Sequence, residues 1–203
     1  DEQCSLGCNT TVTDILENQK LQEVIPNLRQ HLKLVSSEAI RNMGTLGGNF
    51  VNASPIGDMT IFFLALNSNI ILQETNGGKR NLPLNEFYED YKKIDLRKNE
   101  LLFEISFPLP SSTVNVNFEK VSKRTHLDIA SVNSAMLIEP NGDLIQDIHA
   151  SMGGVAPIPK YLKKTVEFLK VKRLSLNNIL EAEQVLQKEI SPISDVRGSQ
   201  EYK

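Results

Sequence analysis

A glycine-rich segment carries the residues best suited to binding a ligand. Gly44, Gly47 and Gly48 fall within five positions, where the lack of a Cβ atom lets the backbone turn tightly and approach a ligand. Exposed N–H groups in such a segment can form an anion-binding nest, to which Thr45 and Asn49 add side-chain hydrogen-bonding groups. The spacing matches neither G-x-G-x-x-G nor the Walker A pattern, so it predicts neither of those phosphate sites.

Asp58 lies shortly after this segment and directly before an apolar run. Its carboxylate could accept a hydrogen bond from a ligand hydroxyl, or it could cap the helix that the apolar run predicts. From the residues alone, a ligand site and a tight structural loop with Asp58 as N-cap are about equally well supported.

The other side chains that could bind a ligand or take part in catalysis are scattered along the sequence. Lys120 and two neighbouring cations lie on a predicted strand and its turn, where such charges usually face solvent. The three histidines lack metal-ligand spacing, and we expect His126 to be a loop residue. No nucleophile elbow or Cys–His signature accompanies the Ser, His and Asp residues. We therefore predict neither a catalytic nucleophile nor a metal site.

The composition excludes several classes of function. The 203 residues carry 22 Lys and Arg against 25 Asp and Glu, a net charge of −3 without the basic cluster that nucleic-acid binding needs. The richest apolar run, residues 61–66, is far too short for a membrane span. Cys4 and Cys8 cannot supply the four thiolates of an iron–sulfur cluster, and such a pair is typical of free thiols in a reducing, cytoplasmic compartment.

Hydrophobic periodicity and turn signals predict an α+β fold in two parts. Two prolines followed by Ser-Ser-Thr place the best internal boundary at 108–113, and Asn141-Gly142 predicts a hairpin. The segment 36–58 is expected to be irregular. Strands are predicted at 3–9, 69–75, 79–84, 101–107, 116–122, 129–139 and 143–152, and helices through 15–17 (capped by Thr11 or Thr13) and at 20–34, 59–66, 160–170 and 176–189, the last with Ser175 as its cap.

The stretch I-R-N-M-G-T-L-G-G-N-F-V-N-A-S-P-I-G-D, residues 40–58, closely resembles the flavin-binding loop of the molybdenum hydroxylases. This family includes xanthine dehydrogenases, aldehyde oxidases and carbon monoxide dehydrogenases, and the resemblance is closest to bacterial xanthine dehydrogenases. It runs across nearly the whole chain, because further matches follow in order: Y-E-D-Y-K-K-I-D-L-R-K-N-E-L-L (88–102), F-E-K-V-S-K-R (118–124) with D-I-A (128–130), G-G-V-A-P-I-P (153–159) and S-D-V-R-G-S-Q-E-Y (194–202).

The resemblance implies a set of FAD-binding residues. Asp58 would hydrogen-bond FAD, and Lys120 would lie near the isoalloxazine ring, where a cation can stabilise the negative charge of reduced flavin. Replacing Lys120 by Ala is then expected to leave the fold intact and alter flavin reduction. The other implied contacts are a flavin-lining segment of Thr45, Leu46, Gly47, Gly48 and Asn49, the ring-packing residues Leu102 and Ile129, and Val35, where relatives often carry a bulkier apolar residue.

The resemblance also implies how the chain is organised and what it works with. Residues 1–110 would form part of an FAD-binding α/β lobe, and residues 111–203 a C-terminal lobe with a small antiparallel sheet and packed helices. Molybdopterin and 2Fe–2S clusters are expected on partner domains or subunits, with NAD as a possible electron acceptor. Family members carry a second Gly-rich loop upstream, for the FAD pyrophosphate, so we expect a longer polypeptide and weak FAD binding by these residues alone. The alternative is a non-catalytic assembly module that no longer binds FAD.

Overall fold

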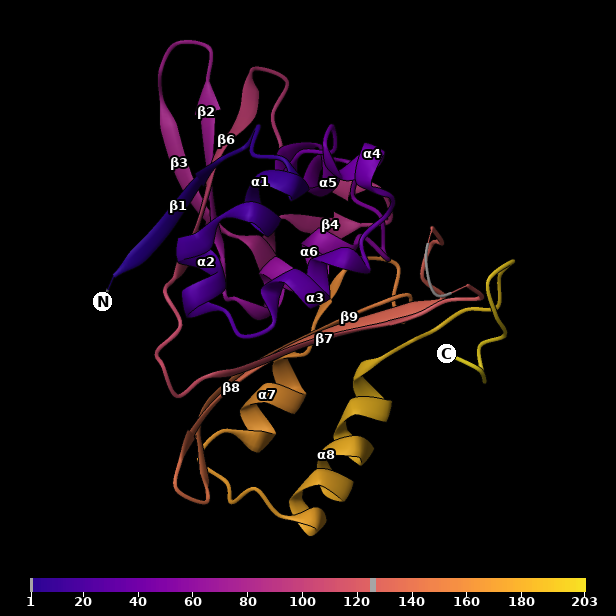
Figure 1. The fold of residues 1–203 in the computed structure, drawn as a ribbon. Coiled ribbons are helices and arrows are strands. Elements are labelled where there is room, and N and C mark those ends of the chain that lie inside the picture. Colours follow the sequence, from indigo (N-terminus) through magenta and orange to yellow (C-terminus); the bar gives the residue numbers. More distant parts are fainter. Residues whose placement is uncertain (1, 125–126) are drawn as a thin grey trace.

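The computed structural model describes residues 2–124 and 127–203, which form two four-stranded antiparallel sheets and the helices around them (Figure 1). His126 and its predicted loop lie outside these residues. The α+β prediction is confirmed. None of the helices in the described part of the chain is both long and apolar enough to cross a membrane.

The first sheet has the strand order β1-β6-β2-β3, so the first strand pairs with one about a hundred residues later. It consists of β1 (Gln3–Gly7), β6 (Glu100–Pro108), β2 (Asn69–Glu74) and β3 (Lys79–Pro83). The predicted hairpin between β2 and β3 is confirmed, and Gly77 supplies the positive φ of its turn. A short 3-10 turn, η1 (Leu84–Glu86), and the small pair β4 (Tyr88–Asp90) and β5 (Lys93–Ile94) precede β6.

Short helices cover the first sheet, and four of them correct the sequence analysis. The single helix predicted at 20–34 is broken at 25–27, because Pro26 lacks an N–H donor and Asn27 adopts a left-handed conformation with φ of 56°. The segment predicted to be irregular contains two helices. The helices are α1 (Val12–Glu17), α2 (Gln19–Val24), α3 (Leu28–Lys33), α4 (Glu38–Arg41), α5 (Leu46–Val51) and α6 (Asp58–Ala65).

The second sheet follows the predicted order with small shifts. Its strands are β7 (Asn115–Val121), β8 (Val132–Asn141), β9 (Leu144–Gly153) and β10 (Lys160–Tyr161), in the order β10-β9-β8-β7. The Asn141-Gly142 hairpin is confirmed, with Gly142 at φ of 60°. Helices α7 (Lys163–Leu169) and α8 (Leu176–Glu189) follow, and Ser175 caps α8 as predicted, by accepting from the Asn178 N–H group.

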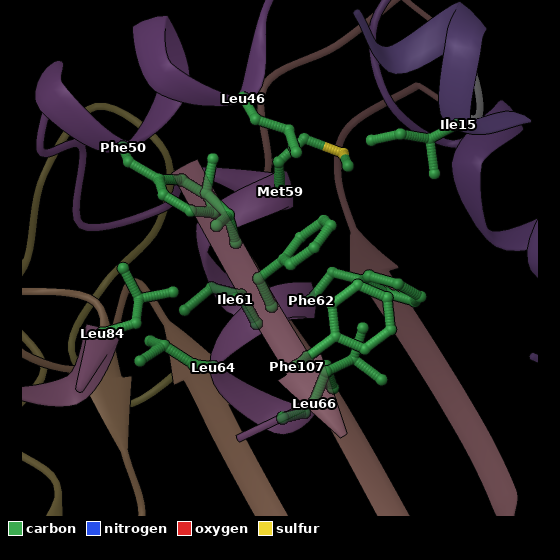
Figure 2. Close-up of a cluster of buried hydrophobic side chains, with 14 of the residues drawn as sticks. Ile15, Leu46, Phe50, Met59, Ile61, Phe62, Leu64, Leu66, Leu84 and Phe107 are labelled. Carbon is green, nitrogen blue, oxygen red and sulfur yellow. The ribbon is translucent and has the colours of Figure 1, made fainter. Parts of the chain in front are cut away.

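Helix α6 joins the two sheets. All its residues from Met59 to Ala65 are buried, as the all-round apolar sequence predicts, and it packs against β8 and β9. Figure 2 shows its side chains with Leu46, Phe50 and Phe107 of the first lobe, and Phe62 also meets Phe118 of β7 edge-on at 6.0 Å. Helices α7 and α8 lie on the other side of the second sheet (Figure 1). One core therefore crosses the predicted boundary near residue 110, and the division into two domains stays a prediction.

Candidate functional site

A pocket of about 390 Å³ opens beside the glycine-rich segment. Four of the residues singled out by the family resemblance line it together: Val35, Thr45, Gly48 and Asn49. The rest of the lining mixes apolar and polar side chains, and Ile40 and Met43 are 59% and 83% exposed beside it. The remaining lining residues are Val12, Ser36, Arg41, Gly44 and Asn52.

Arg41 fixes one wall of this pocket. Its Nη1 atom donates to the backbone carbonyl oxygens of Val35 and Ser36, at 2.8 and 2.9 Å. Ser36 has a positive φ of 48°, so the chain turns sharply where it leaves α3 and enters α4. The guanidinium thus holds a strained turn, which keeps Val35 buried at the pocket edge.

The backbone N–H groups of the glycine-rich segment are occupied inside the protein. Those of Leu46 and Gly47 donate to the carbonyl oxygens of Thr10 and Cys8, at 3.0 and 2.9 Å. Thr45 is the N-cap of α5, and its hydroxyl accepts from Gly48 N–H at 3.1 Å. The Asn49 N–H group donates to Thr45 O. The segment is therefore a docked helix N-terminus, and the expectation of an anion-binding nest is not met at these four positions.

The two adjacent glycines serve different purposes. A Cβ atom at Gly47 would lie 3.0 Å from both Cβ and the carbonyl oxygen of Cys8, so only glycine lets α5 approach the end of β1. A Cβ atom at Gly48 would meet only the Thr45 hydroxyl, at 3.1 Å, and Gly48 is exposed toward the pocket. Gly47 is a packing residue, whereas Gly48 borders the space available to a ligand.

Asn49 ties the pocket to the first turn of α6. Its side-chain oxygen accepts from both the N–H group and the hydroxyl of Thr60, each at 3.1 Å. Gly57, not Asp58, is the N-cap of α6, so the alternative role of Asp58 as a helix cap is wrong. The Asp58 carboxylate makes other contacts instead.

Asp58 and Lys120 form a buried ion pair. Lys120 Nζ donates to Asp58 Oδ2 at 2.7 Å and to the Leu34 carbonyl oxygen at 3.0 Å, next to the pocket wall at Val35. The two side chains are only 11% and 5% exposed. Asn133 Nδ2 donates to the second carboxylate oxygen at 2.7 Å. Burial raises the pKa of Asp58, and the Lys120 ammonium and the Asn133 amide oppose that rise.

The burial of Lys120 changes what its replacement would do. A side chain that is 5% exposed and bonded to two partners contributes to folding, so Lys120→Ala is not expected to leave the fold untouched. Sequence reasoning gave Lys120 a role only through the family resemblance, because a strand lysine is ordinarily a surface charge.

Three of the remaining predicted contacts lie away from the pocket. Leu46 is fully buried in the core, and Leu102 is 4% exposed on β6, paired with Leu72 of β2. Ile129 is 54% exposed and lies beyond the end of β7, where its carbonyl oxygen accepts from Arg197.

Sequence reasoning also missed two residues that complete the site. Asn133 falls in the strand predicted at 129–139 as an ordinary polar residue, and Arg41 lies in the segment predicted to be irregular. Local spacing predicts neither contact. Asn133 donates to Asp58, which lies 75 residues earlier in the sequence. Arg41 donates to the backbone carbonyl groups of Val35 and Ser36 across a turn that the sequence does not indicate. The adjacent glycines of G-G-V-A-P-I-P were the one available signal for Asn133, because Gly153 packs against it.

Two protein-family models match the chain, one on each side of residue 110. Residues 1–110 match the family described as the FAD binding domain in molybdopterin dehydrogenase. The chain belongs to this family. Residues 118–203 match a second model, the CO dehydrogenase flavoprotein C-terminal domain. The family resemblance drawn from the sequence motifs is thereby confirmed.

Relatives of this FAD-binding family cover the chain almost completely. The glyceraldehyde dehydrogenase medium chain of Sulfolobus acidocaldarius is 31% identical over 199 residues, covering 98% of this chain and 70% of that protein. Xanthine dehydrogenase 1 of Arabidopsis thaliana is 31% identical over 173 residues, covering 83% of this chain but 13% of its own length. The xanthine dehydrogenase FAD-binding subunit of Escherichia coli O157:H7 is 26% identical, and the match covers 100% of this chain and 70% of that subunit. Two of these relatives are named as a chain or subunit of a dehydrogenase and the third as a dehydrogenase, so the chain belongs to the oxidoreductases.

The fold is that of a solved family structure. The carbon monoxide dehydrogenase from Hydrogenophaga pseudoflava superimposes with a TM-score of 0.93 at 24% identity, covering 100% of this chain and 70% of the matched chain. At that identity the likeness establishes the fold alone. The chain spans about 70% of the medium chains it matches and a small part of the plant xanthine dehydrogenases.

Proposed function

We propose that this chain binds FAD at the pocket beside α5 and carries electrons within a molybdenum hydroxylase of the xanthine dehydrogenase type. Electrons would reach the flavin from iron–sulfur clusters on a partner domain or subunit and leave to NAD or another acceptor. The observation that carries the proposal is the convergence of four resemblance-derived residues on one pocket, in a chain of the FAD-binding family.

The pocket has the chemistry that a flat heterocycle with polar edges requires. Its volume of about 390 Å³ falls within the range of roughly 300–1,000 Å³ that is typical of small-molecule sites. Val12, Val35 and the exposed Ile40 and Met43 offer apolar walls, while Asn52 and its polar neighbours offer hydrogen bonds. The small side chain of Val35 leaves more room than a bulkier residue would. Leu102 and Ile129 remain proposed ring contacts on the strength of the family resemblance.

Lys120 supplies the positive charge of the proposed site. FAD, when bound, provides the capacity to accept and release electrons. Among the described residues, the Lys120 ammonium donates to Asp58 and to the Leu34 carbonyl group, which accounts for two of its three N–H bonds. A fixed, poorly solvated cation beside the cofactor favours the negative charge that accumulates there on reduction. Asp58 would share its carboxylate between Lys120 and a hydrogen-bonding group of FAD.

The proposed partners are a molybdenum-cofactor subunit and an iron–sulfur domain or subunit. Several relatives are named as medium chains or subunits, which supports a multi-subunit assembly. In the described part of the chain, no three His, Cys, Asp or Glu side chains gather as a metal site would require. The redox metals are proposed for the partners on the strength of the family resemblance. Cys4 and Cys8 are free thiols, which supports a reducing, cytoplasmic compartment.

One observation favours a second candidate, an assembly module that no longer binds FAD. The N–H groups of residues 46–49 are all used within the protein, and Lys120 already has two partners. A chain that keeps this fold only for subunit contacts would need no more than these internal bonds.

The visible absorption spectrum of the full-length protein, purified with its natural partner chains, distinguishes the two candidates. We expect flavin bands together with iron–sulfur absorption, and about one FAD released per chain on denaturation. Iron–sulfur absorption without any releasable flavin would contradict the proposed function and support the assembly module.

A further inference from the structure

Asn133 on β8 contacts the proposed flavin site only through Asp58. It is 2% exposed, and its Nδ2 atom donates to Asp58 Oδ1 at 2.7 Å and to the Ile56 carbonyl oxygen at 3.3 Å. Its Oδ1 atom is buried and accepts no hydrogen bond among the described residues. Turning the amide over would place that oxygen against the carboxylate, so the negative charge of Asp58 dictates the orientation of Asn133.

Asn133 packs closely against the first of a pair of glycines at the end of the neighbouring strand. A Cβ atom at Gly153, on the neighbouring strand β9, would overlap Asn133 Oδ1 and lie 2.8 Å from the Pro55 carbonyl oxygen. Gly153 is followed by Gly154, whose N–H group donates to the same Pro55 oxygen at 3.0 Å. The glycine pair therefore lets the loop before α6 close onto the second sheet, and this closure brings Asp58 to Asn133.

We propose that Asn133 is a positioning residue for the flavin site: its amide holds the Asp58 carboxylate in the orientation in which that carboxylate holds the Lys120 ammonium. The inference rests on the proposed function. The sequence of contacts runs from Asn133 to Asp58, then to Lys120, and ends at the Leu34 carbonyl group beside the pocket wall.

The electrostatics explain why Asp58 needs this second donor. A buried carboxylate loses the solvation of its charge, and burial raises the pKa of Asp58. Hydrogen bonds to the charged form oppose that effect, and a donor on each oxygen also prevents the carboxylate from rotating. Without Asn133, one oxygen would be buried without its donor, and the carboxylate would hold Lys120 less firmly.

A double-mutant cycle on FAD affinity tests the proposal in the full-length protein. The variants are Asn133→Leu, Asp58→Ala and the double variant, titrated with FAD by flavin fluorescence. We expect Asn133→Leu to weaken FAD binding on the order of tenfold, because a hydrogen bond to a charged group contributes this much. Asp58→Ala should weaken it at least as much, and the double variant should bind FAD no more weakly than Asp58→Ala alone, because Asn133 acts only through Asp58.

Ser151→Ala is the matched control. The Ser151 hydroxyl donates to the Ile61 carbonyl oxygen at 2.6 Å, so it joins the same helix to the same sheet and is equally buried, but it does not contact Asp58. This variant should lose stability while its FAD affinity and the reduction potential of its bound flavin stay unchanged. Asn133→Leu and Asp58→Ala should both shift that potential, in the same direction.

Two outcomes would contradict the positioning role of Asn133, and a third would contradict the proposed function. Additive losses of FAD affinity, or an Asn133→Leu variant that binds FAD like the wild type, would overturn the positioning role. If Asn133→Leu does not fold, Asn133→Ser, which is smaller and cannot reach the carboxylate in the same way, replaces it in the cycle. A wild-type protein that binds no FAD would overturn the proposed function itself, and the wild-type titration reveals this before any variant is compared.

Discussion

Lys120 of β7 donates to the carboxylate of Asp58, the first residue of α6, at 2.7 Å across 62 residues of sequence. One partner belongs to the second sheet and the other to the helix buried beneath the first lobe. The pair therefore ties the second sheet to α6, and Lys120 also donates to the Leu34 carbonyl group, which precedes Val35 of the proposed flavin pocket. Because both side chains are removed from water, its loss should affect folding as well as ligand binding.

Removing the cation should leave a buried charge without its partner. Lys120→Met keeps the length of the side chain but not the ammonium, so we expect the free energy of unfolding to fall by about 3–5 kcal/mol. Urea denaturation followed by circular dichroism measures this. Lys93→Met is the control, since Lys93 pairs with Glu89 on the surface and should show no measurable change. A Lys120→Met variant as stable as the wild type would mean that the pair does not form in solution.

The two neighbouring glycines should respond differently to the same substitution. Gly47→Ala forces a Cβ atom against the Cys8 backbone and should cost roughly 1–3 kcal/mol of stability. Gly48→Ala meets only the Thr45 hydroxyl and gains helix propensity, so its thermal midpoint should stay within a few degrees of the wild type. Thermal unfolding of both variants measures the difference. Equal destabilisation would show that Gly47 is not the point of closest approach.

An acid-sensitive ion network joins β3 to the start of β6 and to the loop before it. Arg80 donates to Glu100 at 2.7 Å and to Asp95 at 2.8 Å. The Arg80 guanidinium, with help from the Arg97 N–H group, lowers the pKa of Glu100 from 4.5 to about 2. Because the folded-state pKa lies below the unfolded-state value, Glu100 stabilises the fold above pH 4.5 and loses this contribution as the pH falls toward 2.

Arg80→Met should therefore be less stable than the wild type near neutral pH, with the difference narrowing between pH 4.5 and pH 2. Urea unfolding at a series of pH values measures the difference. A gap of constant size across that range would contradict the assignment of the pH dependence to this network.

Local signals predicted much of the fold. The apolar run of α6, the turn glycines of both hairpins and the Ser175 cap are each specified by adjacent residues, and each was found where it was expected. The helix predicted over 20–34 failed at Pro26 and Asn27, because hydrophobic periodicity continued through a break in the backbone.

The site was predictable as a set of residues but not as a geometry. The family motifs named Asp58 and Lys120 independently, and nothing in their spacing indicates that they bond to each other. Asn133 was missed for the same reason, since its partner is 75 residues away and its own neighbours form an ordinary strand. The use of the Leu46 and Gly47 N–H groups by Thr10 and Cys8 depends on the docking of α5 onto the end of β1.

The most direct test of the central claim is an equilibrium titration of the full-length protein with FAD, comparing Gly48→Leu with the wild type. The leucine side chain would enter the pocket that Gly48 borders, whereas Gly7→Val, at a glycine with open space around it, serves as the control. We expect saturable binding of about one FAD per chain, weakened at least tenfold by Gly48→Leu and unchanged by Gly7→Val. FAD binding of equal strength in all three proteins would show that the flavin is not bound at this pocket.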